Sequence, residues 1–279
     1  MIKNRSRFGL HIRLHDSLFD AASKVQRLGH RFFQTVLMLE SRQFFNMTDD
    51  QVQKFIEFRR VHCDYVYAHG AYWSNLTHIS GRGFHSLLKE VELAEKLEFT
   101  HLVIHPGSFL LDLSSDQRID EISKAIEILL KHSSKIIFLL ENSPHKDRSF
   151  SCDIVEFGKL FQKFKKNHRV KMCVDTAHAY VAGYDLISQK KVNEFVLLLE
   201  KHVGIENIGL LHCNDTKKSC GSFLDMHAVP GQGNIGMESL YAFVHHPKLV
   251  HIPVILEMPT LDESLEVDVI DQFENMEVL

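Results

Sequence analysis

The sequence has no apolar stretch long enough to cross a membrane, no basic tail and no run of five like charges. A membrane-spanning helix needs about 20 consecutive apolar residues, and the N-terminal segment MIKNRSRFGLHI also lacks the apolar core of a secretory signal peptide. The net charge of −4 does not exclude a nucleic-acid ligand, because phosphate contacts need only a local basic surface. We therefore expect an intracellular, cytoplasmic protein without a membrane partner, or one in a nucleoid or viral factory if its source is bacterial or viral.

Cysteine, proline and glycine are sparse. The five cysteines are an odd number and contain no CxxC pair, so we expect reduced thiols rather than a disulfide framework or a cysteine metal site. The 6 prolines and 14 glycines collect after predicted strands, as in PGQGNIG at 230–236, and form no linker. A chain of 279 residues without a linker fits one domain, 1–279, and a (β/α)₈ barrel typically has about 250 residues.

Eight apolar segments rich in β-branched residues alternate with helical patterns. Strands are predicted at 8–12, 31–39, 64–69, 101–105, 135–141, 169–175, 208–212 and 253–257. Helical spacing of apolar residues occurs at 17–29, 49–62, 83–99, 116–134, 154–167 and 191–202, and a last helix is predicted after Pro259. Thr48 and Ser115 precede acidic first turns and are predicted N-caps. Strict alternation predicts an α/β protein, specifically a (β/α)₈ TIM barrel.

Six of the predicted strands end on a residue type that can bind a metal ion. Successive ends lie 34 to 45 residues apart, which fits repeated strand–helix units of about 30 or more residues. Because the C-terminal strand ends of such a barrel gather at one face, where active sites lie, the pattern predicts a metalloenzyme. The six residues are His69, His105, Glu141, Asp175, His212 and Glu257.

Three further residues of ligand type stand close to these ends. His178 follows Asp175 by three residues, so that one helical turn would direct both side chains to one cavity. Asp225 and His227 form an i, i+2 pair in the loop after the seventh strand, which can bind one ion from an extended backbone. The nine residues supply five imidazoles and four carboxylates, which suit zinc, or manganese and iron, better than calcium or magnesium. Nine ligands exceed one tetrahedral ion and suit two or three ions with shared carboxylates.

Several motifs resemble endonuclease IV, a family of zinc-dependent nucleases that cleave DNA at apurinic/apyrimidinic sites. They extend from about Gly9 to Glu257 and include VDTAHAYVAGYDL, LHCNDTKKSCGS, DMHAVPGQGNIG, HPGS, LLENS and ILE. The resemblance implies a DNA-repair hydrolase of base excision repair that cleaves the phosphodiester 5′ of an abasic site and also repairs blocked 3′ ends. Its partner would be double-stranded DNA with abasic sites or blocked 3′ ends. We expect a monomer.

The resemblance also implies a site for three zinc ions, with Mn²⁺ or Fe²⁺ as alternatives for some of them. The first ion would be bound by His69 and His105, with Glu141 bridging to the second. The second would also be bound by Asp175, His212 and Glu257, and the third by His178, Asp225 and His227. Such ions neutralise phosphate oxygens and lower the pKa of water to about 7. Glu141 would orient or deprotonate the attacking water, so alanine there should abolish cleavage.

The residues predicted to contact DNA lie in loops after the strands. Tyr72 and Trp73, the latter the only tryptophan, form an aromatic pair that could wedge between bases. In endonuclease IV the corresponding loop enters the DNA together with an arginine after the second strand, which is Arg42 here. Lys217 and Lys218 are predicted to meet backbone phosphates. The alternative for these residues is an ordinary solvated or packed rim.

Other patterns have a second interpretation. The segment GQGNIG at 231–236 matches the dinucleotide-binding fingerprint, but no predicted strand immediately precedes it, so we interpret it as a loop that holds Asp225 and His227. His11, at the end of the first strand, either lines the pocket or is a core histidine. The histidines expected at the surface are His101, His168, His202, His245 and His246.

The loops depart from the family pattern. Met226 stands where the family usually has arginine, and SPHKDRSF at 143–150 replaces the usual glycine-rich stretch after the bridging glutamate. Two alternatives therefore remain: a xylose-isomerase-like sugar isomerase or epimerase, and a damaged-DNA-binding protein without turnover. The predicted third-ion set of His178, Asp225 and His227 favours the nuclease, because such isomerases hold one or two ions with fewer ligands.

Overall fold

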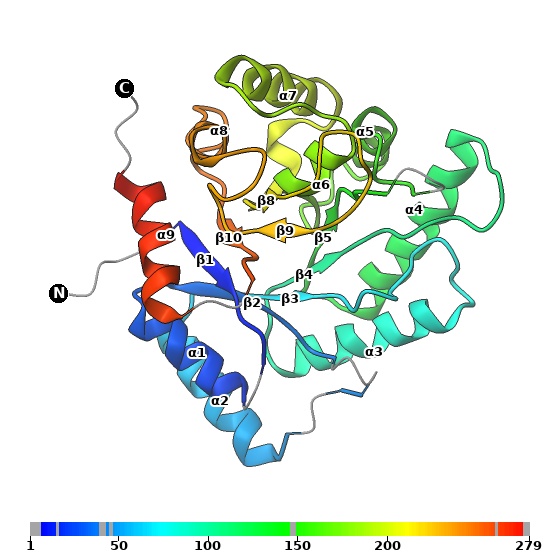
Figure 1. Ribbon diagram of the computed structural model, residues 1–279. Coiled ribbons are helices and arrows are strands. Elements are labelled where there is room, and N and C mark those ends of the chain that lie inside the picture. The colour runs from blue at the N-terminus through cyan, green and yellow to red at the C-terminus, as the bar shows by residue number, and fades with distance from the viewer. Residues whose placement is uncertain are drawn as a thin grey trace.

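The computed structural model describes residues 7–14, 17–38, 43–44, 47–145, 149–259 and 262–275. Eight parallel strands close into a barrel (Figure 1) in the order β1-β10-β7-β6-β5-β4-β3-β2. The last barrel strand pairs with the first, so the predicted (β/α)₈ barrel is confirmed. The strands are β1 (Phe8–His11), β2 (Phe32–Val36), β3 (Tyr65–His69), β4 (His101–Ile104), β5 (Ile137–Glu141), β6 (Val170–Asp175), β7 (Ile208–His212) and β10 (Val254–Leu256).

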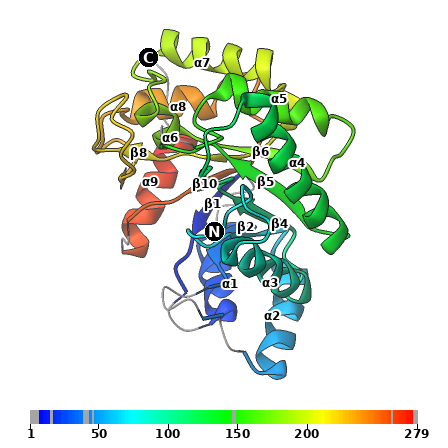
Figure 2. The ribbon, with the colours of Figure 1, turned by 90° about the vertical axis from the view of Figure 1, so that its right-hand side faces the viewer.

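Helices surround the strands, as the view turned by 90° also shows (Figure 2). They are α1 (Leu18–Arg27), α2 (Asp49–His62), α3 (Arg82–Lys96), α4 (Ser115–His132), α5 (Ile154–Lys163), α6 (Thr176–Val181), α7 (Gln189–His202), α8 (Met237–Val244) and α9 (Glu263–Asn275), with the short 3₁₀ helix η1 (Ile205–Asn207). Helix α8 is not among the predicted helices, since its eight residues are too few for a clear period. Within the described residues no helix is long and apolar enough to cross a membrane. None of the five cysteines, all of which lie within the described residues, forms a disulfide.

The two predicted N-caps have different outcomes. Thr48 caps α2 and forms a capping box with Gln51, as predicted. The prediction for Ser115 is wrong, because Ser115 is the first residue of α4 and Ser114 is its N-cap. The Ser114 hydroxyl accepts a hydrogen bond from the Gln117 amide, and the Gln117 side chain accepts one from the Ser114 amide. The capping box requires Gln or Glu three residues after the cap, which selects Ser114 over its neighbour.

The barrel interior consists of an apolar layer beneath a polar one. The apolar layer is fully buried and contains Phe32, Tyr67, Val103, Leu139, Cys173, Leu210 and Ile255. Side chains alternate between the two faces of a strand, so the residue two positions further along also points into the barrel. In all seven cases that residue is polar: Gln34, His69, His105, Glu141, Asp175, His212 and Glu257. The apolar layer therefore closes the barrel below a polar mouth.

The same alternation explains one wrong prediction about the histidines. His101 begins β4, two residues before the inward-facing Val103, and therefore points into the barrel at its opposite end. It is 8% exposed, and its ring stacks on Tyr67 with centroids 4.5 Å apart. Of the other histidines expected at the surface, His168 is exposed, and His202, His245 and His246 are half-buried.

Helix α3 illustrates how the outer helices pack. Its buried residues Phe84, Leu87, Val91 and Ala94 recur at helical spacing and contact the core around the barrel. Burial of each large apolar side chain contributes about 1.5–3 kcal/mol. Glu90 lies on this same face and is also completely buried, although it is a carboxylate.

Candidate metal centre

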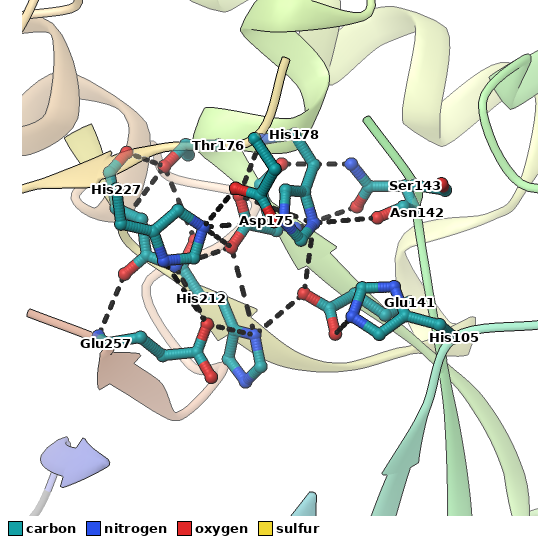
Figure 3. A network of polar contacts seen from close by, with 12 residues as sticks. His105, Glu141, Asn142, Ser143, Asp175, Thr176, His178, His212, His227 and Glu257 are labelled. Atoms are coloured by element: carbon teal, nitrogen blue, oxygen red, sulfur yellow. Dashed lines mark hydrogen bonds and ion pairs between the residues drawn. The ribbon is translucent and has the colours of Figure 1, made fainter. Parts of the chain in front are cut away.

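Glu141, at the end of β5, is completely buried. Its carboxylate lies beside the His105 ring at the polar mouth (Figure 3). Its Oε2 atom lies 3.1 Å from His69 Nε2 and 3.3 Å from His105 Nε2. Its Oε1 atom lies 3.0 Å from His212 Nδ1 and 3.3 Å from His178 Nδ1. The two oxygens thus face two different sets of imidazoles, which is the arrangement that a carboxylate shared between two cations needs.

Glu141 also belongs to a second group, with Asp175, His212 and Glu257. Each of the four residues has one ligand atom, a carboxylate oxygen or an imidazole nitrogen, and these four atoms all lie within 4.8 Å of one another. His212 Nδ1 is 3.3 Å from Glu257 Oε2 and 3.9 Å from Asp175 Oδ2. The barrel register brings these residues together, because Asp175 pairs with His212, and His212 pairs with Ile255 two residues before Glu257.

The third group consists of His178, Asp225 and His227. Asp175 caps helix α6 by accepting a hydrogen bond from the His178 amide at 2.7 Å, which places the His178 ring beside the strand end. His227 lies in the short strand β9 (His227–Ala228), which pairs with β8 (Asp215–Thr216) in antiparallel fashion. The Nε2 atoms of His178 and His227 each lie 3.4 Å from a carboxylate oxygen of Asp225. The structure therefore brings all nine predicted ligand residues, here called the cluster, to one mouth.

The charges of the cluster fit bound cations. Burial opposes ionisation of Glu141 and Glu257, but the neighbouring histidines outweigh it and hold the pKa of both carboxylates well below its usual value. Burial also opposes the charge on His69, yet its hydrogen bond to Glu141 and the charges of Glu141 and Glu257 raise its pKa to about 9. Ionised buried carboxylates need positive charge in contact with them, and metal ions bound by the imidazoles would supply it.

His105 differs from His69. Burial is the main influence on its ring and lowers its pKa to about 4. The ring is therefore neutral at pH 7, which is the form in which imidazole binds a metal ion. His69, His105 and Glu141 together form one of the groups whose ligand atoms lie within 4.8 Å of one another.

Three amide side chains outside the predicted set hold the cluster in place. Gln34 donates to Glu257 Oε1 at 2.6 Å, and its Oε1 atom lies 2.9 Å from His212 Nε2. Asn214 donates to Asp175 Oδ2 at 2.5 Å and to Glu257 Oε2 at 3.0 Å. The Asn142 side chain exchanges two hydrogen bonds with the backbone of Asp175.

The sequence does contain a signal for Gln34, because it lies two residues after the inward-facing Phe32, as the strand-end ligands do in their strands. Asn142 and Asn214 carry no comparable signal. They follow the strand ends by one and two residues, and their roles depend on contacts with neighbouring strands.

The GQGNIG segment wraps around a carboxylate of the protein itself. Asp215 is completely buried and accepts hydrogen bonds from the amides of Gly231, Gly233, Ile235 and Gly236 at 3.0 to 3.3 Å. A Cβ atom on Gly233 would lie 2.2 Å from Asp215 Oδ1, so only glycine fits there. Because these amides already bind an internal anion, the match to a dinucleotide fingerprint does not indicate a pyrophosphate site.

The residues predicted to contact DNA lie on loops around the cluster. Tyr72 is 82% exposed, and Trp73 is half-buried beside it. Lys217 is exposed and Lys218 is half-buried in the loop that follows β8. Arg42 lies outside the residues that the structure describes.

Two other residues singled out in the sequence also lie at the mouth. His11 Nδ1 is 2.9 Å from Gln34 Nε2 and 3.4 Å from Glu257 Oε1, so His11 lies beside the cluster. Met226 is 47% exposed between Asp225 and His227. In the 143–150 segment, residues 146–148 lie outside the described chain, while Phe150 is buried and its ring contacts those of Phe109 and Phe157.

Residues 22–274 match the family model of the xylose isomerase-like TIM barrel. "Probable endonuclease 4" of Nitrosopumilus maritimus is 35% identical over 213 residues, which are 75% of this chain and 74% of that protein. The protein of the same name from Campylobacter concisus is 27% identical over 278 residues, 96% of this chain and 97% of its own. The crystal structure of endonuclease IV from Thermus thermophilus matches with a TM-score of 0.81 and 25% identity, covering 96% of this chain and 98% of that one. The family-model match contains the whole cluster.

Proposed function

Because the chain belongs to the endonuclease IV family of xylose isomerase-like TIM barrels, we propose that it hydrolyses the phosphodiester 5′ of abasic sites in double-stranded DNA. The observation that carries the proposal is the position of Glu141 between two sets of imidazoles in a cluster of nine ligand-type residues. The group of His178, Asp225 and His227 supports a phosphodiesterase over a sugar isomerase, because both imidazoles lie 3.4 Å from an Asp225 oxygen and add a third set of donors beside the first two. His178 and His227 also form a group of ligand atoms with Asp175.

We assign three zinc ions to the cluster. The first would be held by His69, His105 and Glu141, the second by Glu141, Asp175, His212 and Glu257, and the third by His178, Asp225 and His227. Bound zinc would neutralise the phosphate oxygens and make water nucleophilic at neutral pH.

The residues of the chain would divide the remaining work. Glu141 would orient or deprotonate the attacking water. One of its oxygens contacts His69 and His105, and the other contacts His178 and His212. Gln34 and Asn214 would keep His212 and Glu257 in position through the hydrogen bonds described above. The packed apolar layer would exclude bulk water from below.

The rim residues would bind the substrate. Tyr72 and Trp73 would contact the bases that flank the lesion, and Lys217 and Lys218 would contact backbone phosphates. Where a blocking group is joined to the 3′ end through a phosphodiester, the bond to be cleaved is of the same kind, so the same site would remove that group.

The proposal is tested with a labelled duplex that contains one tetrahydrofuran abasic analogue, and with the same duplex without the lesion as control. Incision 5′ of the lesion by protein that contains about three zinc ions supports the proposal. Binding without incision would favour a damaged-DNA-binding protein, and one bound ion without incision would favour an isomerase.

Glu141→Ala separates the role of Glu141 from that of the fold. We expect incision to fall by about 10²–10⁴-fold, the usual contribution of a general base, with an unchanged circular dichroism spectrum. Measurement of bound zinc in the same preparation distinguishes a lost base from a lost ion. Near-normal incision by this variant would contradict the role assigned to Glu141.

A further inference from the structure

The loop after β3 presents its two aromatic residues on a tight turn. The Ser74 amide donates to the Ala71 carbonyl at 2.8 Å, so residues 71–74 form a hydrogen-bonded β-turn. Tyr72 and Trp73 are its two central residues, whereas Ala71 and Ser74 at its ends are buried. The turn therefore leaves Tyr72 exposed and Trp73 half-buried between its two buried ends.

One buried carboxylate holds both ends of this turn. Glu90 Oε2 accepts a hydrogen bond from the Ala71 amide at 2.9 Å, and Glu90 Oε1 accepts one from the Ser74 hydroxyl at 3.0 Å. Glu90 belongs to α3 and is completely buried. Burial raises its pKa to about 7, against the opposing effect of the two hydrogen bonds and the charge of His69. An apolar residue would fit the rest of this helix face, so the two turn donors account for the carboxylate.

The segment is also fixed on either side of the turn. The Gly70 amide donates to the Val103 carbonyl at 2.8 Å, and the Leu76 amide donates to the Pro106 carbonyl at 2.9 Å. The first turn of α3 packs directly on the loop, because a Cβ atom on Gly83 would lie 2.4 Å from the Trp73 carbonyl oxygen. Helix α3 thus provides a rigid base for the aromatic pair.

We propose that Glu90 is a positioning residue that pre-organises the 71–74 turn and so presents Tyr72 and Trp73 to DNA. The proposal rests on the proposed function, since it assigns those side chains to substrate binding. A turn that is already ordered loses little conformational freedom when DNA binds, so the contact between Glu90 and the turn supports affinity rather than the chemical step.

Two substitutions at Glu90 test the contact. Glu90→Gln keeps both ends held, because its carbonyl oxygen can accept from the Ala71 amide and its amide can donate to the Ser74 hydroxyl. Glu90→Met fills a similar volume but offers neither interaction. Trp73 is the only tryptophan, so its fluorescence emission and its quenching by acrylamide report on the turn in the absence of DNA.

We expect Glu90→Met to shift the Trp73 emission and to raise KM for the abasic duplex by about tenfold, the scale of one lost base–aromatic contact, while kcat stays within about twofold. Glu90→Gln should behave like the wild type. The assays are run at pH 8, above the pKa of Glu90. If Glu90→Met does not fold, Ser74→Ala removes one of the two contacts and should give smaller changes in the same direction.

Glu156→Met is the matched control. Glu156 is also a buried helical glutamate, paired with Arg118 at 3.0 Å on the outside of the barrel, and its loss should lower stability without changing Trp73 emission or KM. Unchanged emission and KM in both Glu90→Met and Ser74→Ala would overturn the proposal. A changed emission together with wild-type protein that does not bind the abasic duplex would instead refute the proposed function and leave the Glu90 contact standing.

Discussion

The cluster at the strand ends and the loops around it are held in different ways. Glu141, Asp175 and His212 are completely buried, whereas Tyr72 is 82% and Met226 is 47% exposed. Each buried residue of the cluster contacts several others at 3 to 4 Å, as Glu141 does with four histidines. Tyr72 is instead carried by a turn whose two ends are bound by Glu90, and the Met226 carbonyl accepts a hydrogen bond from the Thr216 hydroxyl.

The difference shows where a single change should act. Two buried carboxylates outside the cluster each hold one loop: Glu90 holds the 71–74 turn, and Asp215 holds the 231–236 loop. A change in the cluster should therefore affect all metal binding and the chemistry, whereas a change in a loop or its carboxylate should affect only the groups that this loop positions. Four experiments test this distinction.

Removal of the metal should have the largest effect. A chelator should abolish incision and lower Tm, because an ion present at 100 times its Kd stabilises the fold by about 2.7 kcal/mol, or about 5–10 °C for a domain of this size. Trp73 emission should change little if the loop is held independently of the cluster. Incision assays, thermal melting and fluorescence measure the three effects, and readdition of zinc should reverse them. A chelated protein with an unchanged Tm and full activity would show that the cluster binds no structural or catalytic ion.

Asp215→Ala should affect one side of the cluster. The substitution leaves the amides of residues 231–236 without their acceptor, and each buried donor without a partner costs about 1–3 kcal/mol. The β8–β9 pair that carries His227 should loosen, weakening zinc affinity about 10–100-fold, as for the loss of other groups that support a ligand. Asp215→Asn retains one acceptor oxygen and should give a smaller loss. Competition with a chelator measures the affinity, and equal values in the wild type and Asp215→Ala would contradict the assigned role.

Tyr72→Ala should weaken substrate binding without loss of metal. We expect KM for the abasic duplex to rise by about 5- to 100-fold, because base–aromatic stacking contributes about 1–3 kcal/mol. Tyr65→Ala is the matched control, since Tyr65 is 44% exposed and begins the same strand at the opposite end of the barrel. A rise in KM that is equal in both variants would assign the effect to the strand rather than to DNA contact.

Lys217→Ala and Lys218→Ala should have the smallest effect. Each phosphate contact that is lost should reduce the slope of log K against log salt concentration by about 0.9, with an affinity loss that is greatest at low salt. Lys124→Ala is the control, because Lys124 is exposed on α4 and pairs with Glu121 at 2.7 Å. Salt slopes equal to that of the wild type would show that these lysines do not contact phosphate.

Most of the fold could be predicted from local periodicity. All eight barrel strands occur where apolar, β-branched segments predict them, because each strand supplies its own pattern. The errors concern features that periodicity does not determine. Ser114 replaces Ser115 as the cap through a side-chain bond, α8 is too short for a clear period, and His101 points into the barrel because of its position in β4.

The sequence by itself determines which side chains the strands carry into the barrel, because alternation along a strand follows from backbone geometry. The sequence alone therefore predicts that a polar residue two positions after an inward-facing apolar residue also points into the barrel. This applies to the strand-end residues of the cluster, from His69 to Glu257. Only the tertiary structure decides which groups distant in sequence meet. Glu90 reaches Ala71 and Ser74, and Asp215 reaches the 231–236 amides, because loops fold back onto buried carboxylates, and no periodic pattern encodes that return.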